Sequence, residues 1–316
     1  MKAIDLFCGI GGIRLGFSKH FNLNVVFSSD IDPNAQKTYL KNFNDQPKGD
    51  ITKISSLEVP SHDLLMGGFP CQAFSLAGKK LGFEDTRGTL FFEVARIIKE
   101  KKPKVIFLEN VKGLVGHDKG KTLKVIINTL KELNYDVHYK VLNAANFGLA
   151  QKRERIYIVG FNKDLVKNSS AFKFPEPLDS KPKISDILEK NVDINYFVSA
   201  QYMKSLVNHK ARHAKKGNGF GYQVIGPSEV ANTVLVGGMG KERNLVKDLS
   251  KPKKTKDKKI NNQNLRVMTE REWARLQGFP DSFIFPCSKT ATYKQLGNSV
   301  AVNVISAIAA KIKEVL

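Results

Sequence analysis

Residues 3–21 read AIDLFCGIGGIRLGFSKHF, an apolar run that a cluster of glycines interrupts before the apolar spacing resumes. Residues 3–9 predict a β-strand, and residues 13–21 predict a helix after the glycine turn. Glycine adopts backbone conformations that other residues avoid, and it lets the chain approach a ligand closely. The stretch therefore predicts a strand, a tight turn and a helix, which together form one unit of a layered α/β protein.

Strand and helix patterns alternate through the first half of the chain. Further strand patterns lie at 24–30, 62–68, 104–110, 136–143 and 155–161, and helical patterns lie at 86–102, at 121–133 and from Asp32 onward. This order predicts an α/β fold with a doubly wound, mostly parallel sheet and helices on both faces. Ligands bind at the carboxyl ends of the strands in such sheets, and those ends here carry FCGIGG, SSD, GGFPCQ and LEN.

The pattern changes near residue 175. A proline-rich link, FPEPLDSKP, is followed by a segment that loses the alternation and contains glycine-rich pieces and a lysine run. We expect a large domain at 1–175 plus 290–316, a second, smaller domain of strands and loops at 184–265, and connecting segments at 176–183 and 266–289. The C-terminal segment 298–316 is too apolar to stand alone, so we expect it to pack back against the large domain.

The composition points to a polyanionic partner. The 316 residues include 51 Lys and Arg against 30 Asp and Glu, a net charge of +21, and the run at 247–259 accounts for only part of the excess. A distributed excess of this size favours nucleic acid, with a membrane surface as the alternative. No apolar run approaches the ~20 residues of a membrane span. Three widely spaced cysteines argue against a disulfide framework or a metal site, so we expect a reducing, cytoplasmic compartment and no metal.

The glycine turn favours a nucleoside-containing cofactor. Asp30 ends the next strand, about 20 residues on, where a carboxylate accepts hydrogen bonds from ribose hydroxyls. A dinucleotide fingerprint would place glycine at position 14, which is Arg14. The alternative is that the glycines serve only the turn.

Two strand ends carry candidate catalytic side chains. Cys71 lies in GGFPCQAFSLAG (67–78), behind a rigid proline and just past a strand, which suggests a nucleophile; an incidental loop cysteine is the alternative. Glu109 ends an apolar strand, where an unpaired carboxylate is costly, so it is either a structural anchor or a catalytic acid. Arg153 and Arg155 begin a neighbouring strand and would neutralise Glu109, lower the pKa of a thiol, or bind a phosphate or a base.

These motifs resemble those of the cytosine-specific DNA methyltransferases that act on ring carbon 5. DLFCGIGG resembles the S-adenosylmethionine loop of that family, GGFPCQAFS its catalytic Pro-Cys loop and LENVKG its Glu-Asn-Val segment. QKRERIYIVG, REWARLQGFPDSF and QLGNSVAVNV resemble the later blocks, in the same order. The resemblance covers most of 1–161 and 266–316 and implies a methyltransferase sheet with a small target-recognition domain.

The resemblance also implies roles for single residues. Cys71 matches the nucleophile that attacks ring carbon 6 of a flipped-out cytosine, Glu109 the residue that bonds ring nitrogen 3, and Arg155 a residue at the base carbonyl; Arg153 joins this catalytic set. The cofactor S-adenosylmethionine is expected at Phe7, Gly9, Gly11, Gly12, Asp30, Asp50, Ile51, Phe69, Pro70 and Asn298. DNA contacts are expected at Ser75, Lys79, Arg87, Thr233 and Arg243.

The expected partner is double-stranded DNA with a short specific site, and GNGFGY resembles segments of enzymes that act on CCNGG-like or CCWGG-like sites. We expect a monomer that works beside a restriction endonuclease. Two alternatives stay open: a tRNA cytosine methyltransferase on the same scaffold, and a non-catalytic DNA-binding protein. The Phe-Pro-Cys loop argues against the first, since that branch typically carries Pro-Pro-Cys, and the intact Cys71 and Glu109 argue against the second.

Overall fold

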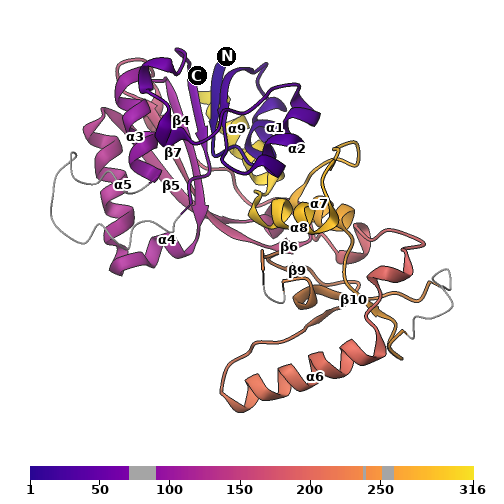
Figure 1. Cartoon of the computed structure of the whole chain (residues 1–316). Coiled ribbons are helices and arrows are strands. Elements are labelled where there is room, and N and C mark those ends of the chain that lie inside the picture. The colour runs from indigo at the N-terminus through magenta and orange to yellow at the C-terminus, as the bar shows by residue number, and fades with distance from the viewer. Residues whose placement is uncertain (71–89, 238–239, 251–259) are drawn as a thin grey trace.

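A computed structural model describes residues 1–70, 90–237, 240–250 and 260–316. Its centre is a six-stranded sheet in the order β2-β1-β3-β4-β7-β5 (Figure 1). The strands are β1 (Lys2–Leu6), β2 (Asn24–Ser29), β3 (Leu64–Gly67), β4 (Val105–Val111), β5 (Tyr135–Asn143) and β7 (Glu154–Asn162). β1 to β4 pair in parallel, and β7 runs antiparallel to both β4 and β5. The predicted doubly wound, mostly parallel sheet is confirmed, with one reversed strand.

Helices cover both faces of this sheet. On one face, α1 (Gly12–Ser18) and α9 (Val302–Val315) bury Phe17 and Ile305 against alternate strand residues such as Phe107. On the other face, α3 (Leu90–Lys101) and α5 (Lys121–Glu132) pack on the strand residues of opposite parity, such as Ile106. The alternation of side chains along each strand thus supplies two separate apolar layers.

The C-terminal helices return to the large sheet, as the sequence predicts. Gly16 of α1 lies so close to α9 that an added Cβ would meet Ile305 at 2.6 Å. α7 (Glu270–Gln277) and α8 (Lys289–Asn298) lead into α9. α2 (Pro33–Phe43) begins where expected, because Asp32 accepts a hydrogen bond from the amide of Asn34 at its first turn.

The segment between the sheet and α7 forms a second unit with its own small sheet, β11-β10-β8. Its elements are α6 (Ala200–Lys215), β8 (Val224–Ile225), β9 (Ala231–Asn232), β10 (Leu245–Lys247) and β11 (Leu265–Arg266). β9 pairs with β6 (Gln151–Lys152), which links this unit to the large one. The remaining short helices are α4 (Gly113–Gly116), η1 (Ile51–Lys53), η2 (Ser56–Glu58), η4 (His117–Gly120), η5 (Ala144–Phe147), η6 (Ser169–Ala171), η7 (Ile184–Asp186), η8 (Ile194–Tyr196) and η9 (Glu242–Asn244).

The prediction of strands and loops alone for the second unit is wrong, because α6 is a helix of 16 residues. Only Met203 and Leu206 of α6 are buried, so the apolar spacing that reveals a helix is nearly missing. The hydroxyl of Ser199 accepts a hydrogen bond from the amide of Tyr202 and caps the helix, and this capping residue was the available signal.

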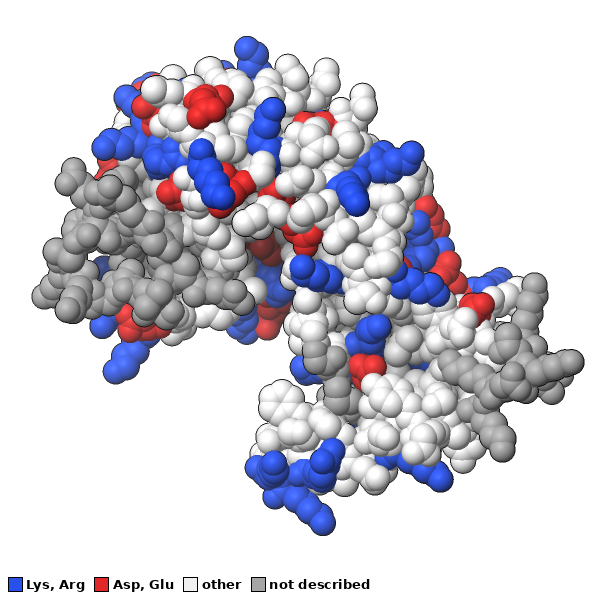
Figure 2. All heavy atoms as spheres, in the orientation of Figure 1, with Lys and Arg blue, Asp and Glu red and all other residues white. Residues whose placement is uncertain are grey.

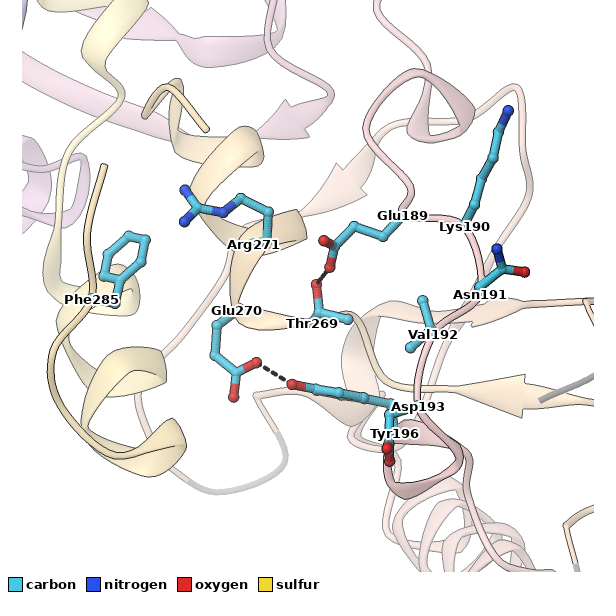
Figure 3. A pocket seen from close by; sticks show the side chains of 10 residues that line it. All are labelled: Glu189, Lys190, Asn191, Val192, Asp193, Tyr196, Thr269, Glu270, Arg271 and Phe285. Carbon is cyan, nitrogen blue, oxygen red and sulfur yellow. Dashed lines mark hydrogen bonds between the residues drawn. The ribbon is translucent and has the colours of Figure 1, made fainter. Parts of the chain in front are cut away.

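A buried ionic network holds the second unit to α7. Arg266, which is fully buried, donates to both carboxylate oxygens of Glu272 at 2.8 and 2.7 Å and to Asp248 at 2.6 Å. A hollow of about 380 Å³ lies beside this network. Among the side chains that line it, Glu270 accepts a hydrogen bond from Tyr196 and Glu189 accepts one from Thr269 (Figure 3). These contacts join the start of the second unit to the start of α7.

Candidate active site

The glycine turn after β1 divides into one open and two packed positions. Gly9 has a φ of 53°, and a Cβ built on it would meet none of the described residues within 4 Å. A Cβ on Gly11 would lie 2.2 Å from Phe43, and one on Gly12 would lie 2.7 Å from Val300. Gly11 and Gly12 are therefore required for packing, whereas Gly9 borders open space. Phe7, beside them, takes a left-handed φ of 52°, which a residue with a side chain rarely adopts.

Asp30 connects this turn to the end of β2. Its two carboxylate oxygens accept hydrogen bonds from the amides of Gly9 and Asp32, both at 2.8 Å. Partial burial raises the pKa of Asp30 against these hydrogen bonds, which act to lower it. Each oxygen keeps a further lone pair, so the carboxylate still has acceptor capacity for a ligand.

Asp50 and Ile51 reach the same edge of the sheet. The amide of Asp30 donates to the carbonyl of Lys48 at 3.0 Å, which places the chain before Asp50 beside the end of β2. Asp50 accepts from the hydroxyl and the amide of Thr52, and these hydrogen bonds lower its pKa. Ile51 is buried. One carboxylate and one apolar side chain therefore stand at this edge, near the glycine turn.

The chain that leads into Cys71 lies against Glu109. A Cβ built on Gly68 would be 3.7 Å from a carboxylate oxygen of Glu109. Phe69 is buried and Pro70 is exposed. The amide side chain of Asn110 donates to the carbonyl of Phe69 at 2.8 Å, which fixes the end of this segment. Asn110 is not among the residues expected from the sequence, although its position as a second polar residue at the end of an apolar strand was a signal.

Glu109 and Arg155 form an ion pair at the carboxyl end of β4. Arg155 Nε lies 3.3 Å from Glu109 Oε1, and both side chains are largely buried. The geometry is not that of a hydrogen bond, and no other residue that the structure describes donates one to Oε1. Burial raises the pKa of Glu109, while Arg155 and Arg153 act in the opposite direction. A buried carboxyl with a raised pKa and a free oxygen fits a group that exchanges a proton with a substrate.

Arg153 performs a different task from Arg155. Its guanidinium donates to three backbone carbonyls, those of Val234, Gly297 and Ser299. Burial lowers its pKa to about 9, with the neighbouring charge of Arg155 adding to the effect. These contacts connect the active-site edge with the second unit and with the end of α8. Arg153 lies near Glu109, but its guanidinium donates its hydrogen bonds to backbone carbonyls.

The other expected residues are spread more widely. Asn298 is exposed at the end of α8, next to Gly297, whose carbonyl Arg153 holds. Thr233 donates to the carbonyl of Lys152 at 2.5 Å, and Arg243 lies in η9, where its carbonyl accepts from Asn232. The positions outside the described residues are Cys71, Ser75, Lys79 and Arg87. Among the described residues, no group of three or more His, Cys, Asp and Glu side chains gathers as a metal site.

Comparisons with known proteins assign this arrangement to a family. The family model for C-5 cytosine-specific DNA methylases matches residues 1–314. The chain belongs to this family. It is 53% identical over 315 residues to the Type II methyltransferase M1.ScrFI of Lactococcus lactis subsp. cremoris, covering 100% of this chain and 78% of that protein. It is also 53% identical over 322 residues to M.HpaII of Haemophilus parainfluenzae, covering 99% of this chain and 89% of that protein.

Solved structures agree on the fold of this methylase. The Entamoeba histolytica methyltransferase EhMeth superimposes with a TM-score of 0.74 at 21% identity, over 99% of this chain and 98% of that one. S. pombe Dnmt2 methyltransferase gives the same TM-score and identity. The enzyme is thus a DNA cytosine-5 methyltransferase of the restriction-modification type, as predicted. None of the helices in the described ranges has the length and hydropathy to cross a membrane.

Proposed function

We propose that this methylase flips a cytosine out of duplex DNA and methylates its ring carbon 5 through the thiol of Cys71. Carbon 5 is a poor nucleophile, and addition of a thiolate at carbon 6 makes the ring electron-rich enough to accept a methyl group. The observation that carries the proposal is the Glu109 carboxyl, which is buried, paired with Arg155, and adjacent to the Gly68–Pro70 segment that leads to Cys71.

Glu109 and Arg155 would hold the base in this scheme. A protonated Glu109 donates to ring nitrogen 3 and offsets the charge that develops when the thiolate adds to carbon 6. Arg155 contacts the base carbonyl and keeps Glu109 oriented. After methyl transfer, a base removes the proton from carbon 5, and the thiolate leaves with the electron pair of the carbon–sulfur bond. Arg153 acts by positioning, since its guanidinium holds three backbone carbonyls.

The cofactor proposed for the strand ends is S-adenosylmethionine, which supplies the methyl group. The residues present fit it, because Gly9 borders open space and Asp30 keeps acceptor capacity for ribose hydroxyls. Asp50 would accept from the adenine amino group, and Ile51 would pack on the adenine ring. Phe7, Gly11, Gly12, Phe69, Pro70 and Asn298 would complete the walls of this site.

Residues 184–265 are proposed to read the DNA, while 1–175 plus 290–316 carry out the chemistry. Figure 2 shows Lys and Arg side chains spread over one face of the molecule, including the waist between its two parts. Thr233, next to β9, donates to the carbonyl of Lys152 in β6, the strand that pairs with β9, and is proposed to contact the backbone of the target strand. Arg243, with Ser75, Lys79 and Arg87, completes the proposed DNA-contact set.

Three further features belong to the proposal. The enzyme acts as a monomer, works in the cytoplasm, and protects host DNA from a paired endonuclease, as the Type II names of its relatives suggest. Bisulfite sequencing of DNA from a host that expresses the chain tests the activity. Methylcytosine at one short sequence, at a fixed position, is the expected result. DNA without methylcytosine, together with methylated host tRNA, would favour the tRNA alternative.

A further inference from the structure

A hollow of about 680 Å³ opens where the large sheet meets the second unit. Three of the residues that line it are lysines from distant parts of the chain: Lys152 of β6, Lys181 of the proline-rich link and Lys210 of α6. The pairing of β6 with β9 brings the first of these segments to the second unit. Lysines converge on this hollow from three segments.

The charge of these lysines is not compensated. Within the described ranges, none of the three forms an ion pair; Lys210 instead lies with its Nζ 4.8 Å from the ring centre of Tyr222. Glu229 is the one carboxylate among the described residues of the lining, and it accepts a hydrogen bond from the amide of Gly226 at 2.7 Å, within its own turn. The hollow therefore presents a net positive charge to solvent.

Neutral polar groups complete the wall. The amides of Gln223 and Asn232 line the hollow and are bonded to each other at 2.6 Å. Asn232 also donates to the carbonyl of Arg243. The side-chain nitrogen of Asn232 thus donates to both Gln223 and the Arg243 carbonyl, which fixes how the two amides are oriented in the wall. The three lysines supply the charge, and lysines bind as point charges, which suits phosphate better than base edges.

The hollow lies close to the active-site edge. Lys152 is three residues from Arg155, and three residues of extended chain span at most about 11 Å. Successive phosphates of one DNA strand advance about 3.4 Å along the helix axis. A strand whose cytosine reaches Arg155 would therefore pass the hollow within a few nucleotides.

We propose that this hollow is a second DNA anchor, in which Lys152, Lys181 and Lys210 bind backbone phosphates of the target-bearing strand beside the flipped cytosine. The proposal rests on the DNA methylase function. It assigns to α6 and the proline-rich link a role in affinity without a role in sequence choice.

The salt dependence of binding tests the anchor. The variant carries Lys152→Gln, Lys181→Gln and Lys210→Gln, and the control carries the same change at three lysines of α5, Lys121, Lys124 and Lys131. Each lost phosphate contact makes the slope of log Kobs against log salt less negative by about 0.9. The slope of the variant at Lys152, Lys181 and Lys210 should therefore be less negative than that of wild type by about 2.7. The affinity should fall by the same factor for a target duplex and a scrambled duplex, and the α5 variant should keep the wild-type slope.

The outcomes separate the anchor from the proposed function. If the variant at Lys152, Lys181 and Lys210 has the same salt-dependence slope as the α5 variant, the anchor is wrong, even if wild type methylates DNA. A loss of affinity confined to the target duplex also overturns it, because the lysines would then read sequence. If the hollow binds only free phosphate, its lysines make no contact with DNA, the slope stays at the wild-type value and the anchor is wrong. Absence of methyl transfer by wild type would refute the proposed function alone, since the slopes are measured without the reaction.

Discussion

Arg155 on β7 and Glu109 on β4 face each other across antiparallel strands, with Nε and Oε1 3.3 Å apart in a largely buried setting. Their register places Arg155 opposite Val111, two residues beyond the glutamate, so the guanidinium reaches back over the end of β4. Within the described residues, no group donates a hydrogen bond to Oε1, the oxygen that faces Arg155. The carboxylate is therefore held by charge and keeps lone pairs for a further hydrogen bond.

Replacing Glu109 with Gln should slow the chemical step by about 10²- to 10⁴-fold, the usual contribution of a positioned proton donor. Gln fills the same space but does not supply the proton that ring nitrogen 3 needs. Single-turnover methyl transfer measures the step, and the Kd for DNA should change far less. An unchanged single-turnover rate would leave Glu109 with a structural role.

Gly11 and Gly9 should respond differently to alanine. At Gly11 the new Cβ would meet Phe43 at 2.2 Å, so Gly11→Ala should lower the free energy of unfolding. Adding Phe43→Ala should relieve the contact, although the φ of 83° still disfavours alanine. At Gly9 the Cβ points into open space, so Gly9→Ala should weaken cofactor binding more than stability, apart from the strain of its φ. Urea unfolding and calorimetric titration with S-adenosylmethionine separate the two effects; equal responses would refute the distinction.

The buried Asp5 should give the stability a defined pH dependence. Burial raises its pKa from 3.8 to about 8, against the opposing effect of Arg14. Between those pH values the folded state binds one more proton than the unfolded state, so this contribution to stability is present at low pH and declines as pH rises toward 8. This contribution changes the free energy of unfolding by about 1.4 kcal/mol per pH unit, and Asp5→Asn should lack that change.

The measurement is urea unfolding of both proteins from pH 5 to 8. The free energy of unfolding of Asp5→Asn minus that of wild type should increase steadily across this range, because only wild type loses the contribution. Asn keeps an oxygen that can accept the hydrogen bond of the Tyr39 hydroxyl, which Asp5 accepts at 3.1 Å. A constant difference would mean that Asp5 is ionised in the folded protein.

Glu272→Gln should destabilise the protein by about 3–5 kcal/mol, because it leaves Arg266 buried with reduced compensation. Both partners are fully buried, and the carboxylate also accepts the amide of Thr269 at 2.8 Å. The matched control is Asp281→Asn, an exposed carboxylate paired with the partly buried Arg275, and its cost should stay below about 1 kcal/mol. Similar losses in the two variants would contradict the importance of the buried network.

Local patterns in the sequence predicted the sheet well, because the signals of a buried strand or a capped helix lie within a few consecutive residues. Asp32 marked the start of α2, and the apolar residues of 105–110 marked β4. α6 was missed because its buried face holds only Met203 and Leu206. A strand or helix could therefore be predicted where its apolar spacing or its capping residue was clear.

Contacts between distant segments were harder to predict. The sequence treats Gly9, Gly11 and Gly12 alike, whereas in the structure the Cβ positions of Gly11 and Gly12 face side chains from α2 and the C-terminal region and that of Gly9 does not. It also grouped Arg153 with Arg155, although the two guanidiniums bind different partners. Residues that lie a few positions apart look equivalent in a motif, and only the tertiary fold shows that they contact different partners.

Cys71 is proposed to start the reaction by adding to carbon 6 of the cytosine ring. Cys71→Ala should reduce single-turnover methyl transfer by several orders of magnitude while the Kd for S-adenosylmethionine and the melting temperature stay near wild type. The most direct measurement uses duplex DNA that carries 5-fluorocytosine at the target, where the proton on carbon 5 is replaced and the adduct cannot resolve. We expect wild type to form a covalent protein–DNA complex, stable in denaturant, and Cys71→Ala to form none. A covalent complex with the alanine variant, or methyl transfer by it at the wild-type rate, would contradict the mechanism.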